Sequence, residues 1–246
     1  MLRLLFGVFL LPLSAALIWA ALKGLAGAAL GASSGPFVAG MVLTAAAWLT
    51  GRAAAESKAA GRAGRLARWV YVAGHELTHA LAAWGLGGKV FGISVGERGG
   101  HVDMSERGAF VALAPYCIPF YALMVIAGYR AILYFQPSAR AESLFLLLMG
   151  AALAFHFLMT WQTLTEARQP DLQHAGGVLF SLALIGAANG LALLLLLKVL
   201  FPHSVTLGSS LRNAGLGAWG FWLGAWKHLG APAARGLWRR ILALAG

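Results

Sequence analysis

Long apolar runs separated by short polar stretches dominate the chain. A helix that crosses a bilayer needs about 20 predominantly apolar residues, and several runs approach or exceed that length. The pattern predicts an all-α integral membrane protein with about six transmembrane helices. The expected spans are Leu4–Leu22, Phe37–Thr50, Trp69–Leu86, 109–135, 143–165 and 177–200.

A polar insert, 87–107, interrupts this pattern after the third run. From Lys89 to Val95, polar or small residues alternate with apolar ones, and Glu97-Arg98-Gly99-Gly100 has the composition of a turn. Alternation with period two followed by such a turn is typical of a β-hairpin. We therefore expect a short membrane-associated β-hairpin directly after the third span.

Basic residues are concentrated in two places. The segment 51–68 is basic and should lie on the cytoplasmic side. The tail, 203–246, has tryptophans at helical spacing and no acidic residue, which predicts an amphipathic helix on an anionic membrane surface. Six spans between these segments would place both termini in the cytoplasm, with the insert and the loop around Asp171 on the opposite side. The prediction rests on Arg212, Lys227, Arg235, Arg239 and Arg240 and on the spacing of Trp219, Trp222 and Trp226.

Composition supports this picture and limits the partners. The chain is 60% hydrophobic and 11% charged, whereas about 25% of residues are charged in a typical soluble domain. The net charge of +11 suits anionic lipid better than nucleic acid, because no soluble basic surface is evident. Cys117 is the only cysteine, which excludes both a disulfide framework and a cysteine-built zinc site. We expect a multi-pass domain, 1–202, in a bacterial-type plasma membrane, followed by the interfacial tail, 203–246.

The candidate chemistry lies in His75-Glu76-Leu77-Thr78-His79. Histidines four residues apart lie on one face of a helix, so both imidazoles can bind one ion. Catalytic zinc takes three protein ligands and leaves a position for water, and Glu76 is then placed to accept a proton from that water. A carboxylate inside an apolar run costs about 3 kcal/mol or more, which favours a functional role for Glu76.

A third ligand must come from elsewhere in the chain. Asp171 is our choice, because Pro170 breaks the preceding helix and Gly176-Gly177 allows the next helix to approach closely. His174 and His156 remain alternatives, and His156 could equally form a hydrogen bond between helices, as could Asn189. His101, in a polar turn, is expected at the surface. The full set of candidates is His101, His156, Glu166, Asp171 and His174.

The sequence resembles the site-2 protease family of intramembrane zinc metalloproteases over about residues 66–190. The resemblance rests on His75 to Leu81, on the glycine-led alternating stretch 88–95, and on Ala112-Leu113-Ala114-Pro115. It implies that Asp171 is the third ligand, although Leu172 stands where the family has glycine. The insert is too short for a PDZ domain, so this chain would be a minimal member.

The expected activity is therefore hydrolysis of peptide bonds in membrane-embedded or membrane-adjacent proteins by one Zn²⁺ ion, with Glu76 as the base. An unwound substrate segment could pair with the strand at Val90–Val95. Two alternatives remain open: a membrane zinc hydrolase acting on lipid-like or small amide substrates, and a non-catalytic membrane chaperone derived from a protease. The intact Glu76 argues against the chaperone, because a scaffold needs no buried base.

Overall fold

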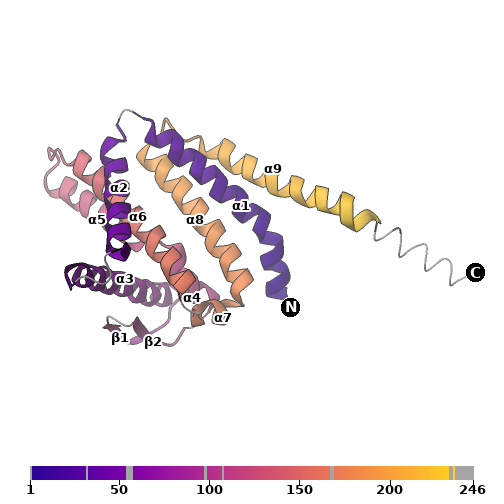
Figure 1. Ribbon diagram of the computed structural model, residues 1–246, viewed down its shortest axis with the longest axis horizontal. Coiled ribbons are helices and arrows are strands. Elements are labelled where there is room, and N and C mark those ends of the chain that lie inside the picture. The colour runs from indigo at the N-terminus through magenta and orange to yellow at the C-terminus, as the bar shows by residue number, and fades with distance from the viewer. Residues whose placement is uncertain are drawn as a thin grey trace, which may run out of the picture.

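A computed structural model describes residues 2–31, 33–53, 58–96, 99–106, 108–166, 169–232 and 235. The chain is mostly helical, with one small sheet (Figure 1). A π-helical turn, Trp226–Gly230, extends the last helix. The elements are α1 (Leu2–Ala29), α2 (Gly35–Ala53), α3 (Lys58–Gly85), β1 (Val90–Gly96), β2 (Gly99–Met104), α4 (Ala109–Cys117), α5 (Phe120–Phe135), α6 (Glu142–Glu166), α7 (Pro170–Ala175), α8 (Val178–Leu200) and α9 (Leu207–Ala225).

Three of the described helices, α1, α6 and α8, are long and apolar enough to cross a membrane. A fourth crossing is possible if α4 and α5, which meet at a bend of 68°, form one broken span. The break falls at Pro119, which ends the helical hydrogen-bonding pattern. The expected spans at Phe37–Thr50 and Trp69–Leu86 fall within α2 and α3, which are not among these candidates. The number of candidate spans among the described residues is therefore three or four, and the expected six are not confirmed.

Two closely packed helix pairs form the frame of the molecule. In the pair α1 and α8, a Cβ added at Gly190 would lie 2.8 Å from the Leu17 carbonyl carbon, so only glycine permits this approach. In the pair α2 and α6, Gly40 and Gly150 each lie directly against the backbone of the other helix. Small residues at helix contacts allow such close approach in apolar surroundings. An apolar core joins the two pairs and includes Leu17, Ala21, Phe37, Leu153, Leu194 and Leu197.

One end of this frame gathers several helix termini. The Arg3 guanidinium donates to the Ala175 carbonyl at 3.1 Å, which ties the start of α1 to α7. The Trp48 indole donates to the Gln162 side chain at 2.8 Å, which ties the last turns of α2 to those of α6. In Figure 1, α3 and the hairpin lie across this same end. We call it the site end.

The expected membrane topology is therefore wrong in one respect. The N-terminus and the Asp171 loop were placed on opposite sides, but the Arg3 contact with Ala175 brings them together. The reason is that α3 lies across the ends of its neighbours (Figure 1). If α3 adds no crossing of its own, the helices that follow it change sides.

The structure bears on two further predictions, the β-hairpin after α3 and the amphipathic tail. β1 and β2 pair antiparallel with Gly96 opposite Gly99, which confirms the predicted hairpin. In the tail, α9 runs along α1, and Trp222 stacks on Phe9 with ring centroids 5.2 Å apart. Trp219 and Trp226 are exposed. Arg239 and Arg240 lie outside the described residues, and the interfacial position of the tail stays a prediction.

The shared end of α1 and α7 gives a testable topology. We expect cysteines placed at Leu2 and Gln173 to react with a membrane-impermeant maleimide from the same face of the membrane, and a cysteine at Ser138 to react from the opposite face. Ser138 is exposed in the loop before α6, at the end of that helix away from the site. Each variant carries Cys117→Ala so that the native thiol is silent. Labelling of Leu2→Cys and Gln173→Cys from opposite faces would contradict this arrangement.

Candidate metal centre

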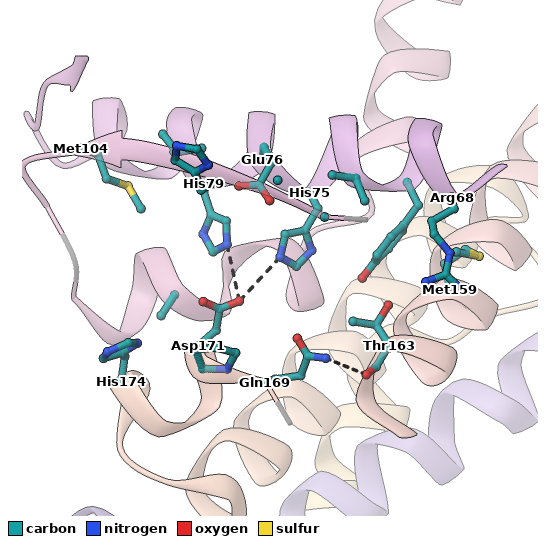
Figure 2. A pocket seen from close by; sticks show the side chains of 18 of the residues that line it. Arg68, His75, Glu76, His79, Met104, Met159, Thr163, Gln169, Asp171 and His174 are labelled. Carbon is teal, nitrogen blue, oxygen red and sulfur yellow. Dashed lines mark hydrogen bonds and ion pairs between the residues drawn. The ribbon is translucent and has the colours of Figure 1, made fainter. Parts of the chain in front are cut away.

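The centre forms where α3 faces α7. His75 and His79 lie one helical turn apart on α3, and Asp171 faces them from the first turn of α7 (Figure 2). Asp171 Oδ2 lies 3.6 Å from His75 Nε2 and 3.7 Å from His79 Nε2. Each residue offers one ligand atom, and all three atoms lie within 4.8 Å of one another. These three side chains could therefore hold a metal ion.

Local sequence explains why Asp171 reaches this position. Pro170 begins α7, where a fixed φ is favourable and the missing N–H is not needed. Gly176 and Gly177 end the short helix with φ values of 137° and 101°, a backbone conformation that L side chains rarely adopt. Leu172 is buried on the inner side of α7. The helix is thus fixed at both ends, with its carboxylate directed at α3.

The two imidazoles differ in their hydrogen-bond partners. His79 Nδ1 lies 2.8 Å from the Val111 carbonyl oxygen. A carbonyl only accepts, so Nδ1 carries the proton and Nε2, which faces Asp171, is left with its lone pair. His75 Nδ1 is buried and has no hydrogen-bond partner among the described residues, while its Nε2 faces Asp171.

The donor set fits zinc. Two ligand atoms about 2.0–2.1 Å from a tetrahedral ion lie about 3.4 Å apart, close to the separations of 3.6 and 3.7 Å between Asp171 and the two histidines. Two imidazole nitrogens and one carboxylate oxygen are also a usual ligand set of catalytic zinc. All three atoms lie within 4.8 Å of one another, so the side chains would close slightly around a bound ion.

The electrostatics favour the ligand forms of Asp171 and His75. Burial alone would raise the pKa of Asp171, but the imidazoles of His75 and His79 that face the carboxylate outweigh it and hold that pKa below its usual value. Burial also lowers the pKa of His75, which keeps the imidazole neutral. A carboxylate and a neutral imidazole are the protonation states that bind metal.

Glu76 lies beside the three ligands. It is 6% exposed, and Figure 2 shows its carboxylate on α3 next to His75. Burial raises the pKa of this carboxyl. β2 lies against it so closely that a Cβ added at Gly100 would be 2.6 Å from Glu76 Cγ.

A cavity of about 560 Å³ opens over the ligands and Glu76. Its wall is formed by residues of α3, β2 and α4, by the last turns of α6 and by the start of α7. Besides the ligands and Glu76, the cavity is lined by Arg68, Gly100, His101, Asp103, Gln162, Thr163, Gln169 and His174, among others.

The other candidate ligands lie outside the three-residue group. His174 lines the cavity, and His101 is exposed, with Nε2 3.9 Å from Asp103 Oδ2. His156 is buried in α6, where its Nε2 lies 3.0 Å from the Asn189 Oδ1. The side chain of Glu166 lies outside what the structure describes.

Two residues of the site were not predicted. Tyr116 donates a hydrogen bond to Asp171, and Gly100 makes room for Glu76. A tyrosine directly after the Ala112–Pro115 element was a visible signal, because a polar group in an apolar run usually has a partner. Nothing in the local sequence of Gly100 points to Glu76.

Comparisons with protein-family models, with curated proteins and with solved structures each find no match for this chain. The resemblance to site-2 proteases thus rests on the motifs and remains a prediction.

The contact between Gly100 and Glu76 predicts the effect of one methyl group. In Gly100→Ala, the new Cβ would lie 2.6 Å from both Glu76 Cγ and the Ser94 carbonyl oxygen, so the hairpin must move. Such overpacking costs about 1–3 kcal/mol, and we expect a lower Tm in detergent. Gly128→Ala, on α5, is the matched control, because its Cβ would meet nothing within 4 Å. Equal Tm values for the two variants would show that β2 does not press on Glu76.

Proposed function

We propose that this protein is a zinc-dependent metalloprotease that hydrolyses peptide bonds of membrane proteins or peptides at the membrane surface. The observation that supports this most directly is the placement of Glu76 beside a group of His75, His79 and Asp171 that could hold a metal ion, in one cavity. Ligand binding alone would not require a buried, non-coordinating carboxylate at that position.

Each residue has a defined role in this proposal. His75, His79 and Asp171 hold the ion. A bound Zn²⁺ would polarise the scissile carbonyl and lower the pKa of a water in the cavity. Glu76 accepts the proton of that water and returns it to the leaving amine. Burial raises the pKa of Glu76, which brings the carboxyl closer to the working pH and so suits it to both steps.

The position of the cavity favours a substrate segment next to the bilayer. The cavity lies at the site end of the frame, between the last turns of α6 and the hairpin. β2 lines it, whereas the residues of β1 do not. A substrate in extended conformation could therefore add to the outer edge of β2, rather than to Val90–Val95 as the sequence suggested.

Charge favours a cytoplasmic site. Arg3 at the start of α1 lies at the site end, as do Arg62, Arg65 and Arg68 on α3. Basic residues that flank membrane helices are enriched on the cytoplasmic side. We therefore expect the cavity to open toward the cytoplasm.

Glu76→Gln tests the assigned chemistry. The substitution keeps the shape of the side chain but removes the base, so we expect zinc binding to persist and hydrolysis to fall by a factor of at least about 10². The measurement compares new peptide termini in the membrane proteins of cells that express wild-type protein, Glu76→Gln or the control Glu142→Gln. Glu142 is exposed at the start of α6, away from the site.

Three results are informative. Termini present with wild type and Glu142→Gln but absent with Glu76→Gln support the protease. Unchanged termini together with lipid changes that depend on Glu76 would replace it with the lipid or amide hydrolase. No change in termini or lipids would favour the non-catalytic chaperone.

A further inference from the structure

Tyr116 is the residue that links the candidate metal centre to the apolar helices. It is fully buried near the end of α4, and its hydroxyl lies 3.0 Å from Asp171 Oδ2 and 3.1 Å from Gln169 Oε1. Its ring meets the His75 ring edge-on, with centroids 5.0 Å apart and planes at 85°. One side chain therefore contacts ligands from both α3 and α7.

The hydroxyl can fix the Asp171 carboxylate. Both histidines approach the same oxygen, Oδ2, and the hydroxyl donates to that oxygen. A carboxylate oxygen has lone pairs enough for a ligand bond and a hydrogen bond together. The two imidazoles face Asp171 Oδ2 from α3 at 3.6 and 3.7 Å, whereas the Tyr116 hydroxyl reaches the same oxygen from α4 at 3.0 Å.

The backbone of Tyr116 is fixed in turn by Asn189 on α8. The Asn189 Nδ2 donates to the Tyr116 carbonyl at 2.7 Å and to the Ile185 carbonyl at 2.9 Å. α4 ends one residue after Tyr116, so that carbonyl belongs to the last turn, which lacks intrahelical donors. Asn189 supplies the missing donor.

His156 completes the chain of contacts. The Asn189 Oδ1 lies 3.0 Å from His156 Nε2, and because this oxygen only accepts, His156 Nε2 is the donor. Both Asn189 amide hydrogens are used on carbonyls, and its oxygen is used on His156. Asn189 on α8 thus contacts both α4 and α6, and all of its polar side-chain atoms have partners. These contacts fix the position of Tyr116.

We infer that Tyr116 is a positioning residue that sets the geometry of the metal centre through Asp171, and that Asn189 holds Tyr116 in place for that role. The inference rests on the metal centre of the proposed function but not on proteolysis. Partners that orient metal ligands in this way typically contribute about 10- to 100-fold in metal affinity.

The test is zinc affinity, measured by competition with a chromogenic chelator on the full-length protein in detergent. We expect Tyr116→Phe to bind one zinc with about 10- to 100-fold lower affinity. Asn189→Leu should shift affinity in the same direction. The control is Tyr129→Phe, because Tyr129 stacks on Phe145 in α5 and α6, away from the site, and its affinity should equal that of wild type.

A double-mutant cycle separates positioning from general destabilisation. If Tyr116 acts through Asp171, Tyr116→Phe should have little further effect on zinc affinity in an Asp171→Asn background. An undiminished effect there, or wild-type affinity in Tyr116→Phe alone, would overturn the inference. Tight zinc binding that depends on Tyr116, with no peptide hydrolysis, would uphold it while defeating the protease proposal. Absence of zinc binding by wild type would defeat both.

Discussion

The contact of Asp171 with His75 and His79 joins α7 to α3, and the function proposed for this chain depends on it. A carboxylate at the edge of an apolar helix frame loses much of its hydration, which is costly unless partners replace that water. Here the two imidazoles and the Tyr116 hydroxyl are those partners. A divalent cation among the same atoms would compensate the charge further. The side chains that would form the metal site therefore also offset the cost of burying the Asp171 carboxylate.

The rest of the fold serves to keep α3 and α7 at this separation. Close backbone contacts at Gly190 and at Gly40 hold each helix pair together, and the pairs end in the termini that carry the cavity. The break at Pro119 separates α4 from α5, which leaves the Tyr116 carbonyl free for Asn189. The break between α4 and α5 thus lies between the apolar helices and the polar site, where a free carbonyl has a use.

Periodicity and turn chemistry made the local features predictable. Four-residue spacing placed His75 and His79 on one helix face, and alternation from Lys89 to Val95 indicated β1. Pro170 and Gly176 marked the bend that exposes Asp171. These signals are local, because helix periodicity, strand alternation and backbone φ are properties of neighbouring residues.

The orientation of α3 and the roles of Tyr116 and Gly100 depend on tertiary contacts, which local sequence patterns do not indicate. The sequence predicts Trp69–Leu86 as one more span, but the orientation of α3 depends on α4, β1 and β2, which pack against it. The roles of Tyr116 and Gly100 likewise arise from residues distant in sequence. The sequence predicts an interhelical hydrogen bond for Asn189, but not that this one side chain joins α4, α6 and α8.

The most direct test of the account is metal content per mole of detergent-purified protein, with wild type beside His75→Ala, Asp171→Ala and Glu76→Gln. The account predicts about one zinc in wild type and in Glu76→Gln, because Glu76 does not coordinate, and its loss from the other two variants. Zinc retained in Asp171→Ala, or no metal in a folded wild type, would contradict the site on which every functional statement here depends.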